Sequence, residues 1–183
     1  MRLSDLHSKV DIYNKRLYNE DMDKMPTVYL DMDGVLVNLE KGAYKVHGKK
    51  LSDVPKPERW EKISDVKDFW KELEWMPGAK KMWSFISSYD PHILSAYSTK
   101  DANSRKGKMN WLRSNAKLTQ KSRIHLVMRE DKQKYAMTTD GKPNLLIDDY
   151  IKNVNEWKAK GGIGVHHTSP SDTIAQLKRL GFK

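Results

Sequence analysis

Short apolar runs alternate along this chain with segments in which apolar residues recur at helical spacing. The runs are rich in β-branched and aromatic residues, which is typical of buried strands: TVYLDMDGVLV, HILSA, RIHLVM, PNLLIDD and IGVHHT. The segments with helical spacing are residues 79–89, 104–115, 131–137, 151–162 and 169–182. Strands that alternate with helices predict an α/β fold, a doubly wound, Rossmann-like parallel sheet.

Turn residues and caps set the expected ends of these elements. Gly161 or Gly162 is expected to end the fourth helix, and Ser171 or Asp172 to cap the last one.

Two regions lie outside this alternation. Residues 1–25 place Leu6, Val10, Tyr13 and Leu17 at helical spacing, which predicts an amphipathic N-terminal helix. Residues 38–77 form short, charged pieces that contain tryptophan and are broken by prolines, with a helix expected at 65–75. We expect residues 26–183 to be the core domain, and residues 38–77 to be a small helical cap inserted after the first strand.

Composition limits the function classes. The chain has 183 residues, no cysteine and a net charge of +10, so thiolate metal sites and disulfides are excluded. No run is apolar enough for a membrane span or a signal core, and we expect a cytoplasmic protein without a membrane partner. The positive charge favours anionic partners, either a small phosphorylated substrate or nucleic acid.

Pairs of acidic residues follow two of the apolar runs. Asp31 and Asp33 surround the end of the first expected strand, and Asp148 and Asp149 end the run LLI. An open α/β sheet places its ligand site at the carboxyl ends of its strands, and a turn at Gly34 lets both members of the first pair face one cavity. One carboxylate can act as nucleophile and the other as general acid and base, while the crowding calls for a hard cation such as Mg²⁺.

The motif DMDGV resembles the first motif of the haloacid dehalogenase superfamily of phosphatases, over about residues 27–168. The resemblance implies that Asp31 is the nucleophile and Asp33 the acid and base. It also implies that Ser95 binds the phosphoryl group, that Lys132 in REDK neutralises its charge, with Lys134 as the alternative, and that Asp148 and Asp149 bind the metal. Asp31 and the backbone carbonyl of Asp33 complete the implied Mg²⁺ ligands.

Within that superfamily the chain is most similar to the 5'(3')-deoxyribonucleotidases and their phage and bacterial relatives. The shared, ordered motifs are DMDGVLVNLEKG, FWKELEWMPGA, the lysine and tryptophan at 108 and 111, REDK and LLIDD. The resemblance implies that Trp60 in the cap contacts the base. Leu39 stands where those enzymes usually carry a phenylalanine, and Ser64 lies near the place of a second cap aromatic residue.

These observations predict a Mg²⁺-dependent phosphomonoester hydrolase that forms an aspartyl-phosphate and acts as a 5'-nucleotidase on (deoxy)nucleoside monophosphates. A polynucleotide end phosphatase is the first alternative, favoured by the net charge and the short cap. A non-catalytic nucleic-acid or protein-binding module on the same fold is the second. Spacing does not decide whether Arg105, Lys106 and Lys108 of one expected helix contact phosphate or face solvent, and the oligomeric state stays open.

Overall fold

The central strand β1, Val28–Leu30, belongs to a five-stranded sheet in a computed structural model that describes residues 25–183. Every pair of neighbouring strands is parallel, in the order β3-β2-β1-β4-β5. The other strands are β2 (His92–Ala96), β3 (Ile124–Val127), β4 (Leu145–Asp148) and β5 (Ile163–His166). The expected α/β, Rossmann-like fold is thereby confirmed, and the expected N-terminal helix lies outside the described residues.

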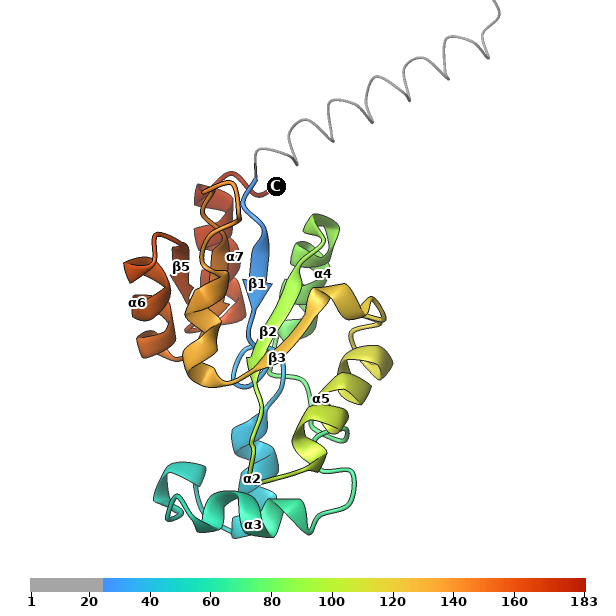
Figure 1. Cartoon of the computed structure of the whole chain (residues 1–183). Helices are drawn as coiled ribbons and strands as arrows, with labels where there is room; N and C mark the ends of the chain where they lie inside the picture. Colours follow the sequence, from blue (N-terminus) through green and yellow to red (C-terminus); the bar gives the residue numbers. More distant parts are fainter. Residues whose placement is uncertain (1–24) are drawn as a thin grey trace, which may run out of the picture.

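Helices pack on both faces of this sheet (Figure 1). The α-helices are α2 (Leu39–His47), α3 (Glu58–Ser64), α4 (Ala79–Ile86), α5 (Asn103–Ser114), α6 (Ile151–Ala159) and α7 (Pro170–Arg179). Short 3₁₀ helices are η1 (Leu51–Asp53), η2 (Ser87–Tyr89), η3 (Lys121–Arg123) and η4 (Arg129–Tyr135). No helix within residues 25–183 is long and apolar enough to cross a membrane.

Alternate residues of the central strands β1 and β4 enter two separate apolar clusters. Leu30 and Ile147 join the larger cluster with residues of α4, α5 and α7, while Tyr29 and Leu146 join the smaller one with Trp157 of α6. Successive side chains of a strand point to opposite faces, so both faces of the central strands are buried. This double burial explains why the strands have nearly continuous apolar sequences.

Residues 38–77 extend beyond the carboxyl ends of the strands, where Figure 1 shows α2 and α3. The two ends of the segment lie side by side, because Asn38 N donates to Glu74 O at 2.8 Å and Met76 N donates to Leu36 O at 2.8 Å. The segment therefore leaves and re-enters the core at one place. Its role as a cap over a substrate stays a prediction.

The expected helix at 65–75 is wrong, because these residues form successive turns. Asp68 has a positive φ of 56°, which interrupts a right-handed helix. Phe69, Trp70 and Leu73 are nevertheless all buried in the core.

The predicted N-cap of the last helix, Ser171 or Asp172, is also wrong by two or three residues. Ser169 is the N-cap of α7, since its hydroxyl accepts a hydrogen bond from Asp172 N, and Pro170 occupies the first turn. Proline is favoured there because its missing N–H has no partner in a helix.

Candidate active site

Carboxylates from two adjacent strands meet at the carboxyl edge of the sheet. Asp31 follows β1, Asp148 ends β4, and the two strands pair with Leu30 opposite Ile147. Asp31 N donates to Ile147 O at 2.9 Å, which holds the two strand ends in register. Asp31, Asp148 and Asp149 each offer an oxygen within 4.8 Å of the others. The structure thus brings together three of the four acids that the sequence singled out.

The turn after Asp31 requires glycine at its centre. Gly34 has a φ of +74°, and a Cβ at this position would overlap the carboxylate of Asp149. Val35, Leu36 and Val37 donate their N–H groups to Met32 O, which closes a tight turn. Gly34 therefore supplies both the left-handed backbone and the space in which the Asp149 carboxylate lies.

Lys132, from η4, is the counter-charge of the acidic cluster. Its ammonium group is 3% exposed and lies 2.7 Å from Asp148 Oδ2 and 3.0 Å from Asp31 Oδ1. Burial alone would lower the pKa of Lys132, but the two carboxylates more than offset it and the pKa is raised. Lys134 instead extends into solvent and pairs with Asp131. Of the two candidate lysines, the structure brings only Lys132 to the acids.

Asp148, the last residue of β4, and Asp149, which follows it, are unfavourable as isolated anions. Burial, followed by the charge of Asp31, raises the pKa of Asp148 to about 6 and that of Asp149 to about 7. Asp149 keeps some exposed surface, yet its carboxyl group lies against Gly34 and beside the other acids. Asn153 Nδ2 donates to Asp148 Oδ2 at 2.9 Å, which fixes the orientation of that carboxylate.

These residues fit a divalent, oxygen-preferring cation. All the offered ligand atoms are carboxylate oxygens, and Asp31 Oδ1 has no hydrogen-bond donor among residues 25–183 although it lies in the ion pair with Lys132. Mg²⁺ binds through one or two carboxylates and keeps several waters, which suits a cluster with one exposed member. The side chain of Asp33 is not part of this cluster.

Asp33 belongs to a second group of polar side chains, centred on Lys108. The Lys108 ammonium donates to Asp33 Oδ2 at 2.5 Å, to Ser95 Oγ at 3.1 Å and to Ala96 O at 2.6 Å. Burial raises the pKa of Asp33 against the opposing charge of Lys108. Asp33 Oδ1 is buried and has no hydrogen-bond partner within residues 25–183, so this oxygen is free for a ligand.

Spacing left the role of Lys108 open, although its sequence carried a usable signal. Lys108 lies on one face of α5 with Ser104, Trp111 and Leu112, all of which are buried. A lysine on the apolar stripe of a helix is rare unless its charge has a partner. Arg105 and Lys106, by contrast, lie off this buried face.

A cavity of about 370 Å³ opens beside Asp33. Its walls are the loop 96–100 after β2, the start of α3 and the side chains of Trp60 and Trp70. Trp70 donates Nε1–H to Asp101 Oδ2 at 2.5 Å and stacks on Trp60 with ring centroids 5.8 Å apart. Trp60 lines this cavity, and its contact with a base stays a prediction. Leu39 is not among the described residues that line the cavity and packs against the core.

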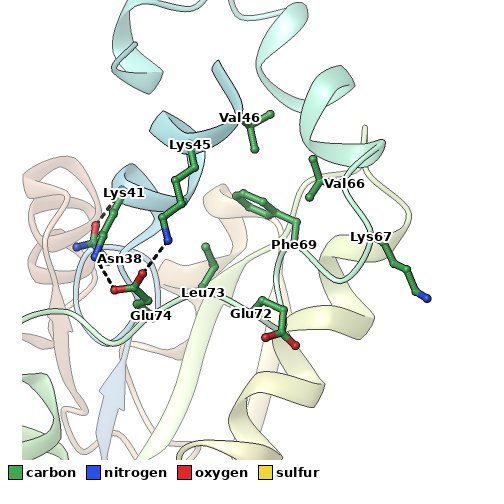
Figure 2. Close-up of a pocket in the computed structure, with 11 residues that line it drawn as sticks. Asn38, Lys41, Lys45, Val46, Val66, Lys67, Phe69, Glu72, Leu73 and Glu74 are labelled. Atoms are coloured by element: carbon green, nitrogen blue, oxygen red, sulfur yellow. Dashed lines mark hydrogen bonds and ion pairs between the residues drawn. The ribbon is translucent and has the colours of Figure 1, made fainter. Parts of the chain in front are cut away.

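A second cavity, of about 190 Å³, lies between α2 and residues 66–74 and is shown in Figure 2. Its floor is apolar, with Phe69 and Leu73, and its cations Lys41 and Lys45 both bond Glu74. These bonds lower the pKa of Glu74 to about 2. None of the acids of the sheet edge lines this cavity, so the larger one is the candidate substrate site.

The comparisons with known proteins bear on the fold. A scan against protein-family models and a search of the curated proteins found no match to the chain. The crystal structure of a dehalogenase superposes with a TM-score of 0.54 at 11% identity, over 88% of this chain and 99% of that chain. Hydrolases from Streptococcus pneumoniae and Pseudomonas syringae give TM-scores of 0.48 and 0.49 at 13% and 16% identity. They cover 86% of this chain each, and 98% and 91% of their own chains. The chain therefore shares the overall α/β fold of this dehalogenase.

Proposed function

We propose that this chain is a Mg²⁺-dependent phosphomonoester hydrolase of the haloacid dehalogenase superfamily that acts on nucleoside monophosphates through an aspartyl-phosphate at Asp31. The observation that carries the proposal is the pairing of two aspartates, one buried and one half-buried, with two buried lysines at one sheet edge. Asp31 contacts Lys132, and Asp33 contacts Lys108. Each acid thus has its own counter-charge and a separate role.

Asp31 is suited to be the nucleophile. In the first step a carboxylate oxygen of Asp31 forms a bond to phosphorus while the ester P–O bond breaks. The Lys132 ammonium group lies 3.0 Å from Asp31 Oδ1, and the Lys108 ammonium group lies 3.1 Å from Ser95 Oγ. Fixed donors of this kind stabilise the charge that develops on phosphoryl oxygens.

Asp33 is suited to be the general acid and base. Because its pKa is raised by burial, it can hold a proton on Oδ1 and give it to the leaving oxygen. The resulting carboxylate then takes a proton from the water that attacks the phosphorus of the aspartyl-phosphate. Phosphate leaves, and Asp31 regains its carboxylate.

Asp31, Asp148 and Asp149 would hold the Mg²⁺, together with the backbone carbonyl of Asp33. When bound, the ion would reduce the repulsion between these acids and the substrate phosphate. Burial, followed by the charge of Asp31, raises the pKa values of Asp148 and Asp149, and a bound cation would stabilise their ionised forms.

The substrate class is inferred from the walls of the larger cavity. Its volume of about 370 Å³ lies within the range of roughly 300–1,000 Å³ typical of small-molecule sites. Trp60, Trp70 and Tyr97 supply aromatic surface next to Asp33, which suits the flat base of a nucleotide.

The test is phosphate release, with Mg²⁺, from nucleoside monophosphates and from sugar phosphates as competitors. Asp31→Asn is expected to reduce turnover to background, and EDTA to stop the wild-type reaction. Asp65→Asn is the matched control, because Asp65 is exposed and lies outside the acidic cluster. Full activity in Asp31→Asn would refute the assignment of the nucleophile.

A second variant tests the division of labour between the aspartates. Asp33→Asn is expected to slow turnover by about 10²–10⁴-fold, the usual contribution of general acid–base catalysis. With p-nitrophenyl phosphate labelled in its phosphate, whose leaving group needs no proton, this variant should accumulate labelled phosphate bound to the protein. The bound label should survive acid and be released by hydroxylamine. The absence of that label would argue against an aspartyl-phosphate.

A further inference from the structure

The larger cavity contains more positive charge than one phosphate group requires. Besides the aromatic side chains, Lys56, Arg59 and Lys100 line it. Asp33 is the sole acid among the described residues that line the cavity, and Lys108 already neutralises it. No ion pair within residues 25–183 involves Lys56, Arg59 or Lys100, so three cations face this space without a protein counter-charge.

The cleaved phosphate does not account for these cations. It would lie at Asp31, where Lys132 and Lys108 already supply two buried ammonium groups. Of the three further cations, Lys100 lies on the loop that follows β2, Lys56 precedes α3 and Arg59 lies in its first turn. Neither Lys108 nor Lys132 is among the described residues that line the cavity, so the three cations are available to a second anionic group on the same substrate.

The local structure fixes part of this outer set. Arg59 donates Nε–H to Val54 O at 2.8 Å and a terminal N–H to Ser52 O at 3.1 Å, which holds its guanidinium in place. The Arg105 guanidinium lies 5.5 Å from the centre of the Tyr97 ring and adds positive charge beside the same loop. Cations interleaved with Trp60 and Tyr97 are the arrangement that binds alternating phosphates and bases in single strands.

We propose that the substrate carries a second phosphate group, bound by Lys56, Arg59 and Lys100, in addition to the phosphate cleaved at Asp31. This inference rests on the proposed function and narrows its substrate class. The second group is either the 3'-phosphate of a nucleoside 3',5'-bisphosphate or the first phosphodiester of a 5'-phosphorylated oligonucleotide. Both place an anion one nucleoside away from the scissile phosphate.

The experiment compares kcat/KM for thymidine 5'-monophosphate, thymidine 3',5'-bisphosphate and 5'-phosphorylated dithymidylate. Exposed ion pairs are individually weak, and three together are expected to favour a two-phosphate substrate by about tenfold, mainly through KM. The preference should decline as salt is raised from about 50 to 200 mM, because exposed charges are screened. The relative rates of the bisphosphate and the dinucleotide identify the source of the second phosphate.

The double variant Lys56→Ala, Lys100→Ala tests the location. In this variant, the ratio of kcat/KM for the two-phosphate substrate to kcat/KM for thymidine 5'-monophosphate should approach 1. The matched control is Lys49→Ala, Lys67→Ala, which removes the same charge from exposed positions that do not line this cavity. Figure 2 shows Lys67 extending away from the smaller cavity on the same segment. The control should keep the full preference.

The outcomes separate this inference from the proposed function. Equal kcat/KM for one and two phosphates would overturn the inference and leave the hydrolase intact. A preference that survives in the Lys56→Ala, Lys100→Ala variant would overturn the assignment to these lysines. No phosphate release from any of the substrates would overturn the proposed function itself, and the inference with it.

Discussion

Replacing Lys132 with methionine removes the counter-charge of the acidic cluster while keeping most of the side-chain volume. The Lys132 ammonium group is 3% exposed and contacts Asp31 and Asp148 at 3.0 and 2.7 Å. At an effective dielectric constant of about 20, charges about 3 Å apart attract by roughly 5 kcal/mol before dehydration is counted. Dehydration offsets much of that attraction, and breaking a buried pair typically costs about 3–5 kcal/mol.

Proton uptake sets an upper limit to this loss. In Lys132→Met we expect Asp148 to take up a proton on folding, since burial and Asp31 already raise its pKa from 3.8 to about 6. Neutralising the Asp148 carboxylate costs ~1.4 kcal/mol for each unit by which the pH exceeds its unfolded pKa of 3.8. The cost is therefore at most about 4 kcal/mol at pH 7 and about 2 kcal/mol at pH 5. The folded variant binds the proton more tightly than the unfolded chain does, so its deficit shrinks as the pH falls.

The expected result is a loss of about 3–4 kcal/mol in unfolding free energy at pH 7, which narrows to about 2 kcal/mol at pH 5. Urea unfolding in EDTA, followed by tryptophan fluorescence, measures both values. Lys134→Met is the control and should unfold like the wild type, because Lys134 is exposed. A deficit below about 1 kcal/mol at pH 7, or one that does not narrow at pH 5, would refute the role of Lys132 as the counter-charge.

Two further predictions concern backbone and pH. Gly34→Ala should lose about 1–3 kcal/mol of stability by urea unfolding, since a left-handed alanine is strained, and should also weaken Mg²⁺ binding by calorimetry because its Cβ displaces the Asp149 carboxylate. His92 bonds His125 at 2.9 Å, and burial, then the charge of His125, lowers the pKa of His92 to about 4. Between pH 6.5 and 4, His92 is protonated in the unfolded chain but stays neutral in the folded protein. The free energy of unfolding therefore decreases as the pH is lowered through this range. After discounting for solvent screening, the wild type should lose about 1–2 kcal/mol more than His92→Gln over this window. Parallel curves for the two proteins would contradict this.

The sequence by itself determined the α/β fold and the position of the acids. Buried parallel strands need apolar side chains on both faces, so Val28–Leu30 and Leu145–Ile147 were recognisable as continuous apolar runs. Because parallel strands end at the same edge of a sheet, Asp31 and Asp148 could be expected to meet there. Local chemistry alone indicated these features.

Only the tertiary structure decided the partners of those acids and the shape of residues 65–75. Lys132 and Lys134 are two residues apart in the chain, and packing of η4 against α6 rather than spacing turns one to Asp148 and the other to solvent. Lys108 reaches Asp33 across 75 positions of sequence. In residues 65–75, the positive φ of Asp68 interrupts the expected helix, although Phe69 and Trp70 are buried. Long-range packing decides such features because its free energy exceeds local propensity, and the sequence shows only the latter.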